Sequence, residues 1–282
     1  MKSIKKLLNP KNDYVFKRIF GYVGNEEITK GLISAIIDDI EITNIKLDLQ
    51  EITPEDLKDD KFGILDIRAE INNTIQTNIE MQMVDKKDIE NRIMFYWSRL
   101  YASSIKKGEK YIKAKKTIII LFTDYEIKGH EKIEKYLSKW QIREEEYKEI
   151  ILTENLEICI IELPKYEKYT SENTKLNAWV KFIRKPEDIS MEDVNNNEAL
   201  KKAKEVLDEI SGDKREEELA FQRLMYKMDI EATEAAGYDR GIEQGVAMEK
   251  LEIARNMLKK EISIETIIEC TGLTKEEIEK IQ

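Results

Sequence analysis

Alternation of apolar and polar residues across residues 64–84 predicts a β-hairpin. Two alternating runs flank Asn72 and Asn73, which are residues that favour turns. A two-residue loop would place charged and apolar residues together on both faces of the hairpin. A three-residue loop, residues 72–74, instead separates them. The apolar pairs that then face each other are Ile71 with Ile75, Ile67 with Ile79, and Leu65 with Met81.

The same register places Asp66 opposite Glu80 on the polar face, because directly opposed residues share a face. Two carboxylates about 4 Å apart repel by roughly 4 kcal/mol at an effective dielectric constant near 20. A shared proton, the neighbouring Arg68 or a divalent cation such as Mg²⁺ would offset this repulsion. The alternative is a solvent-exposed polar face without a site. We expect a metal ion between Asp66 and Glu80.

The remaining hydrophobic pattern predicts an α/β fold in which a mixed sheet core is flanked by helices. Helical spacing follows Asn12, and it recurs in residues 28–40, 88–106 and 177–183. Strand patterns cover residues 42–49, 117–122, 136–144 and 156–163, and the uninterrupted run 117–122 is typical of a strand buried on both faces. Residues 191–197 read as a linker, and only helix follows. We therefore expect a sheet domain over residues 1–190 and an all-helical region over residues 198–282.

The helix predicted over residues 88–106 follows the hairpin and is basic on one side. Arg92, Arg99 and Lys106 recur at intervals of seven, so they would form one stripe suited to a phosphate backbone. The chain as a whole has a net charge of −10, and its acidic surplus lies in the C-terminal half. The alternative for this stripe is a solvated helix face. We expect Arg92, Arg99 and Lys106 to bind nucleic acid.

Composition excludes several kinds of catalytic site. His130 is the only histidine, which removes most support for histidine metal clusters and for Ser-His or Cys-His nucleophiles. Cys159 and Cys270 give no zinc-binding spacing. No run approaches the ~18 apolar residues of a membrane span, and the first residues lack an apolar signal segment. We expect a cytoplasmic protein without membrane contact, whose chemistry depends on carboxylates, amides, lysines and metal.

The C-terminal region combines a glycine stripe with a short helical hairpin. Gly237, Gly241 and Gly245 lie four residues apart, which suggests either close approach of another backbone or a flexible connector. Residues 263–282 resemble a helix-turn-helix, with a Thr-Gly turn and a capping box at Thr274 and Glu277. Residues 261–282 hold six Glu and two Lys, which disfavours contact with phosphates. We expect this region to form a homo-oligomer or to regulate the protein.

Several segments in order resemble one known family. The chain is similar to the PD-(D/E)XK nuclease family transposases, also called recombination-promoting nucleases (Rpn). The segments that resemble the family are residues 13–20, Asp66, the run 78–82 (NIEMQ), the helix with Arg92 and Tyr96, residues 108–111, residues 162–165 (ELPK) and the glycine-spaced C-terminal helix with its turn at residues 271–274.

The resemblance implies a restriction-endonuclease-like core and a metal-dependent DNA endonuclease. Asp66 and Glu80 would bind Mg²⁺, together with the carbonyl of Met81, and Gln82 would orient the attacking water where the wider superfamily has a lysine. Asp13 in the first helix either joins the metal site or only complements the helix dipole. The alternatives are a non-catalytic oligomeric binding protein on a nuclease fold, and an RNase.

Overall fold

The computed structural model describes residues 6–48, 67–85, 87–169 and 174–281. These residues form two compact units, Met1–Leu224 and Met225–Gln282. Asp66 lies outside the described residues, as do Ile64 and Leu65 of the predicted hairpin.

A six-stranded mixed sheet forms the centre of the first unit, in the order β1-β2-β3-β4-β6-β5. The first three strands are antiparallel neighbours, β3, β4 and β6 run parallel, and β5 pairs antiparallel with β6. The strands are β1 (Ile45–Asp48), β2 (Ile67–Ile71), β3 (Ile75–Gln82), β4 (Lys116–Thr123), β5 (Leu137–Trp140) and β6 (Leu156–Glu162). The mixed sheet predicted from the sequence is confirmed.

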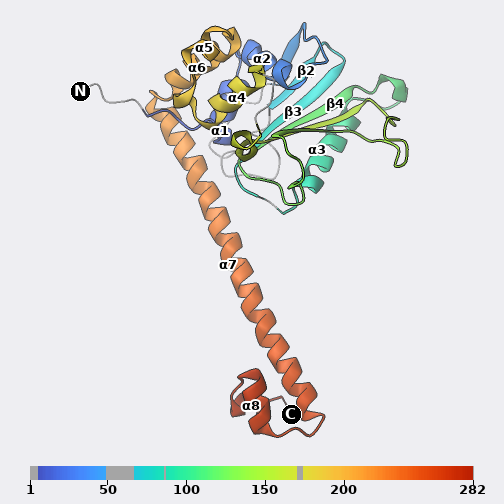
Figure 1. Ribbon diagram of the computed structural model, residues 1–282, viewed down its shortest axis with the longest axis vertical. Helices are drawn as coiled ribbons and strands as arrows, with labels where there is room; N and C mark the ends of the chain where they lie inside the picture. The colour runs from blue at the N-terminus through green and yellow to red at the C-terminus, as the bar shows by residue number, and fades with distance from the viewer. Residues whose placement is uncertain (1–5, 49–66, 86, 170–173, 282) are drawn as a thin grey trace, which may run out of the picture. The chain divides into compact units, whose positions relative to one another are not determined.

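Helices cover both faces of this sheet (Figure 1). Helices α1, α2, α4 and α6 share one apolar core with one face, and α3 packs on the other face. The α-helices of the first unit are α1 (Asp13–Phe20), α2 (Glu26–Ile36), α3 (Ile89–Ser103), α4 (Thr174–Arg184), α5 (Met191–Asn195) and α6 (Glu198–Ile210). Short 3₁₀ turns lie at η2 (Tyr111–Lys113), η3 (Leu163–Glu167) and η4 (Pro186–Asp188).

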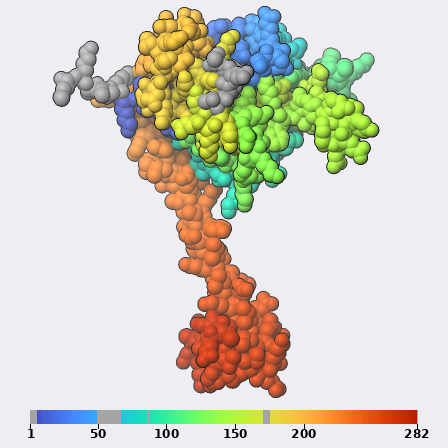
Figure 2. Space-filling model, viewed as in Figure 1, coloured from blue at the N-terminus to red at the C-terminus, as the bar shows by residue number. Residues whose placement is uncertain are grey.

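Strand β4 is buried on both faces, as its continuous apolar run predicts. Ile118 and Ile120 contribute to the core shared with α1 and α2, whereas Ile119 and Leu121 pack with α3. The parallel neighbours of β4 require crossover connections, and α3 supplies the one between β3 and β4. The segment 141–155, light green in Figure 2, stands out from the edge of this unit and is largely exposed.

The first unit extends further along the chain than the expected boundary at residues 190–198. Leu200, Ala203, Leu207 and Ile210 of α6 are buried in the main core, so this helix belongs to the sheet unit. Residues 191–195 form α5 rather than a linker, since Ser190 caps the helix through the backbone NH of Asp193. The periodicity of α6 indicated a helix but not the surface against which it packs.

The second unit contains α8 (Ile264–Thr271), α9 (Lys275–Glu279) and most of α7 (Lys214–Leu258), which is continuous with the first unit. A small core of Ala254, Ile267, Leu273 and Ile278 joins the three helices. Gly272, at φ +68°, ends α8, and the predicted capping box of Thr274 and Glu277 begins α9. Among the described helices, none combines the length and the apolar character that a transmembrane span requires.

Candidate active site

The β2–β3 turn sets the register of the candidate site. Asn72 and Asn73 have φ values of +52° and +61°, a conformation that Asn adopts more readily than most residues. The Thr74 NH donates to the Ile71 carbonyl at 3.1 Å, which closes the three-residue loop. The Asn72 carboxamide also accepts hydrogen bonds from the backbone of Thr43 and Asn44, so the turn is anchored to the segment before β1.

The resulting register is the one that the hydrophobic pattern predicts. Ile71 pairs with Ile75, and Ile67 pairs with Ile79. The expected pairing of Asp66 with Glu80 concerns a residue outside the described part of the chain, so it stays a prediction.

One face of β3 presents polar side chains toward α3. Glu80 lies beside Leu121 of β4, whose side chain packs with α3, and the polar residues of the strand alternate with Ile75, Ile79 and Met81 of the main core. The polar residues on this face are Gln76, Asn78, Glu80 and Gln82. Arg92, near the start of α3, contacts Glu80 near the end of β3, and Leu100, near the end of α3, contacts Gln76 near the start of the strand. The helix therefore runs antiparallel to the strand.

Glu80 is buried between a cation and an amide. Its relative exposure is 4%, and Nη2 of Arg92 donates to its Oε1 at 2.7 Å. The side-chain amide of Gln82 donates to the same oxygen. A buried carboxylate requires such partners, because burial of an unpaired charge costs several kcal/mol. The sequence indicated Arg92 as a ligand for phosphate, whereas the structure places its guanidinium on Glu80.

Tyr125 lies close to this ion pair, and no sequence pattern indicated it as a site residue. Its hydroxyl oxygen is buried and has no hydrogen-bond partner among the described residues. Burial, together with the nearby carboxylates of Asp85 and Glu80, raises the pKa of Tyr125 well above its ordinary value. The hydroxyl therefore stays protonated and can donate a hydrogen bond, but it cannot take up a proton.

The expected basic stripe of α3 is only partly present. The helix ends at Ser103, and Lys106 lies beyond it in a turn where its backbone NH donates to Glu109. The prediction of helix to residue 106 was wrong because Ser104 caps the helix and the chain turns at Gly108, at φ +88°. Arg99 remains on the exposed surface of α3.

A pocket of about 220 Å³ adjoins Arg99 on the same face of the sheet. Tyr96 belongs to its wall, and the ring of Tyr96 also contacts the Arg92 guanidinium, whose Cζ lies 5.2 Å from the ring centroid. The pocket is therefore contiguous with the Glu80–Arg92 pair. Its lining consists of Arg68, Asn78, Tyr96, Arg99, Leu100 and Ser103.

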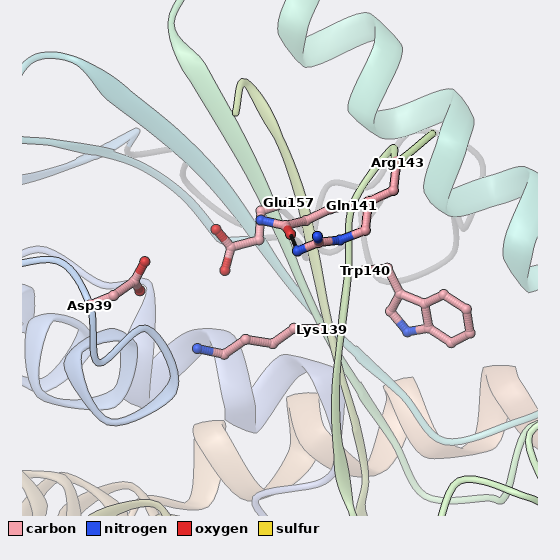
Figure 3. A pocket seen from close by; sticks show the side chains of 6 residues that line it. All are labelled: Asp39, Lys139, Trp140, Gln141, Arg143 and Glu157. Carbon is pink, nitrogen blue, oxygen red and sulfur yellow. Dashed lines mark hydrogen bonds between the residues drawn. The ribbon is translucent and has the colours of Figure 1, made fainter. Parts of the chain in front are cut away.

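A larger pocket, of about 490 Å³, lies at the β5 edge (Figure 3). Glu157 and Lys139 line it from the face opposite Glu80, since their neighbour Cys159 belongs to the main core. Its principal charges are compensated: Lys139 bonds Asp38 at 2.9 Å, and Glu157 bonds Lys116 at 2.7 Å. This pocket is separate from the residues that the sequence selected.

Asp13 pairs with an arginine near the start of α7. The Arg223 Nη2 lies 2.8 Å from Oδ2 of Asp13, and its Nε lies 3.1 Å from both carboxylate oxygens. The Tyr14 backbone NH also donates to Asp13. These contacts favour a structural role, in which Asp13 anchors α7 to α1.

No three His, Cys, Asp or Glu side chains within the described ranges are close enough together to hold a metal ion. The donor atoms at Glu80 nevertheless suit a hard cation, because the Glu80 carboxylate and the Gln82 amide offer oxygen ligands of the kind that Mg²⁺ accepts. Arg92 now occupies one oxygen of Glu80, so a metal ion would replace or join this guanidinium.

Two family models match the chain. The model described as PD-(D/E)XK nuclease family transposase matches residues 10–236, which include the hairpin, α3 and α6. The model described as Rpn/YhgA-like nuclease family, C-terminal HTH domain, matches residues 248–282, and the helix-turn-helix expected there is confirmed. Searches of curated proteins and of solved structures gave no match. The first match spans most of the chain, and the protein therefore belongs to the PD-(D/E)XK nuclease family transposases.

Proposed function

We propose that this protein is a metal-dependent DNA endonuclease of the recombination-promoting type, which hydrolyses phosphodiester bonds. The observation that supports this function best is the setting of Glu80. Its carboxylate is buried on the polar face of β3 and is bonded to Gln82 and Arg92. Asp66, outside the described residues, is the proposed second carboxylate.

Asp66 and Glu80 would hold the divalent cation, which we propose to be Mg²⁺. When bound, the cation would offset negative charge on the reacting phosphate and promote ionisation of water. The Gln82 amide, which bonds Glu80, would orient the water by hydrogen bonding. An amide neither gives up nor accepts a proton at neutral pH, so Gln82 cannot replace a catalytic lysine in proton transfer.

Arg92 and Tyr125 would act as donors at the same site. Arg92 stays protonated and supplies positive charge beside Glu80, where a phosphate would enter. Tyr125 also keeps its proton, because its pKa is raised. Of Glu80, Gln82, Arg92 and Tyr125, only Glu80 can accept a proton, and we therefore expect slow turnover.

DNA is the proposed substrate, because the protein joins a nuclease-family unit to a helix-turn-helix, a fold widely used for DNA binding. We assign the main phosphate contacts to the first unit, through Arg99, Lys106 and the neighbouring lysines. The acidic α8–α9 segment is less suited to phosphate, and we propose that it supports self-association.

A non-catalytic DNA-binding protein is the second candidate, and Gln82 in place of lysine is the observation that favours it. An RNase would use the same site chemistry. Incubation of supercoiled plasmid with Mg²⁺, with and without EDTA, separates these functions. Nicking that requires Mg²⁺ supports the endonuclease, and binding without nicking supports the second candidate. Cleavage confined to a competing RNA supports the RNase.

A further inference from the structure

The pocket beside α3 contains two arginines that form no ion pair with the described residues. Arg68 comes from β2 and Arg99 from α3, and both line the 220 Å³ pocket together with Asn78. Among the described residues, neither guanidinium has an ion-pair partner within 4.0 Å. Asp48 lies opposite Arg68 on β1, but no ion pair joins the two. This contrasts with Arg92, which is bonded to Glu80.

The chemistry of this pocket suits a phosphate. Arginine presents planar N–H donors that match phosphate oxygens in pairs, and two such groups converge here from different elements. The buried Asn78 and the hydroxyl-bearing Ser103 and Tyr96 add polar groups to the lining. A neutral or cationic ligand would leave two positive charges uncompensated.

The position of the pocket relates it to the proposed catalytic carboxylate. Asn78 precedes Glu80 by two residues on the same face of β3, a separation of about 7 Å along a strand. Each DNA strand carries one charge per roughly 3.4 Å along the helix axis. A phosphate in the pocket would therefore lie one or two nucleotides from a phosphate at Glu80. The Tyr96 ring, which contacts Arg92, bridges the two positions.

We propose that Arg68, Arg99 and Asn78 form a second phosphate-binding site, which holds the DNA backbone next to the scissile phosphate. This inference rests on the proposed nuclease function for the identity of the neighbouring site, but not for the binding itself. Arg68 and Arg99 are positioning residues: they fix the register of the strand relative to Glu80 and take no part in bond cleavage.

The test is a DNA-binding titration in EDTA, followed by fluorescence anisotropy of a labelled duplex. Arg99→Met and the double variant Arg68→Met/Arg99→Met should each weaken binding, by roughly tenfold per arginine removed. The slope of log K against log salt should fall by about 0.9 per lost phosphate contact. Lys201→Met is the matched control, because it removes one exposed positive charge from α6, on the opposite side of the sheet. Thermal unfolding of each variant checks folding, and exposed Arg99 gives a variant that should fold normally.

A duplex series with one uncharged methylphosphonate linkage at successive positions identifies the contact. Wild-type binding should weaken at a specific linkage, and the double variant should lose sensitivity at that linkage alone. An unchanged sensitivity profile in the double variant, an equal effect of Lys201→Met, or a wild type that binds no duplex would each overturn the proposal. This experiment measures binding and not cleavage. A protein that fails to cleave DNA could therefore still have the phosphate-binding site, and a protein without this site could still cleave DNA.

Discussion

Arg92 of α3 and Glu80 of β3 form an ion pair with 2.7 Å between Nη2 and Oε1. The pair lies near the C-terminal end of β3, an interior strand of the sheet, and the side-chain exposures of Arg92 and Glu80 are 16% and 5%. It holds the helix to the strand and also supplies the cation that a buried carboxylate needs. A metal ion and Arg92 therefore share the same carboxylate in the proposed mechanism.

Replacement of Arg92 by methionine should make the protein depend on divalent cations for stability. Loss of the guanidinium leaves Glu80 buried without its cation, which should cost about 3 kcal/mol in EDTA. A metal ion that binds only the folded state should restore part of this loss. Differential scanning fluorimetry with and without Mg²⁺ measures the effect. The rise in Tm on adding Mg²⁺ should be larger for Arg92→Met than for wild type or Arg99→Met, and equal rises would contradict the prediction.

The buried Lys165 should be essential for stability. Its Nζ lies 2.9 Å from Glu162 and donates to the carbonyls of His130 and Ile133, at 1% exposure. Lys165→Met leaves the buried Glu162 carboxylate without its lysine partner and should lower the free energy of unfolding by about 3–5 kcal/mol. Urea denaturation measures this. The control is Lys168→Met, whose exposed pair with Glu126 should contribute at most about 1 kcal/mol. Similar effects of the two substitutions would refute a structural role for Lys165.

The hairpin register could be predicted because side-chain alternation and a turn sequence act over short distances. The pattern of Ile67, Ile71, Ile75 and Ile79 allows one register only, and the structure has it. Strand β4 was also predictable, since a continuous apolar run requires burial on both faces.

Contacts between distant segments could not be predicted in this way. The pairing of Asp13 with Arg223 joins residues 210 positions apart, and no periodicity encodes it. The partner of Arg92 could not be predicted either, because helical spacing places Arg92 on a polar stripe but does not indicate its ion pair with Glu80. The hairpin pattern identifies Arg68 only as a neighbour of Asp66, because the pocket that Arg68 forms with Arg99 depends on how α3 crosses β2 and β3.

Asp13 should prove structural rather than catalytic. Asp13→Asn weakens the buried pair with Arg223 and should destabilise the first unit by about 3 kcal/mol. Arg223→Met should have a similar effect, and the double variant should lose less than the sum, since the two residues share one interaction. Chemical denaturation of the three variants gives the coupling. An Asp13→Asn protein of wild-type stability that fails to cleave DNA would instead place Asp13 in the metal site.

Self-association is proposed to involve the glycine face of α7. A Cβ added at Gly237, Gly241 or Gly245 would meet nothing within 4 Å in the described chain, so a close backbone approach there would have to come from another chain, which we propose to be a second copy. Gly241→Leu should therefore dissociate the oligomer, while Gly241→Ala should preserve it. Truncation after residue 230 keeps Arg223 and should give a folded monomer. Multi-angle light scattering decides: a monomeric full-length protein, or a truncated form with unchanged oligomeric state, would exclude this role.

Cys159 should resist modification until the protein unfolds. Burial, reinforced by Glu157, raises the pKa of its thiol above the ordinary value, whereas Cys270 is exposed. Below the ordinary thiol pKa of about 8.5 this group leaves the free energy of unfolding independent of pH, because the thiol is protonated in both states; at higher pH the free energy of unfolding falls, because the unfolded state ionises and the buried thiol does not. Iodoacetamide labelling at pH 8 followed by mass spectrometry should modify Cys270 alone. Labelling of Cys159 without denaturant would contradict its burial, and Cys270→Ser provides the control.

Plasmid nicking by matched variants measures whether Glu80 supports Mg²⁺-dependent DNA cleavage. Wild-type protein should convert supercoiled plasmid to nicked or linear forms with Mg²⁺ but not with EDTA. Glu80→Gln and Asp66→Asn should abolish this conversion. Glu70→Gln should keep it, because Glu70 lies on the same hairpin but pairs with Lys115. Cleavage by Glu80→Gln at the wild-type rate, or no cleavage by the folded wild-type protein at any Mg²⁺ concentration, would contradict the proposed function.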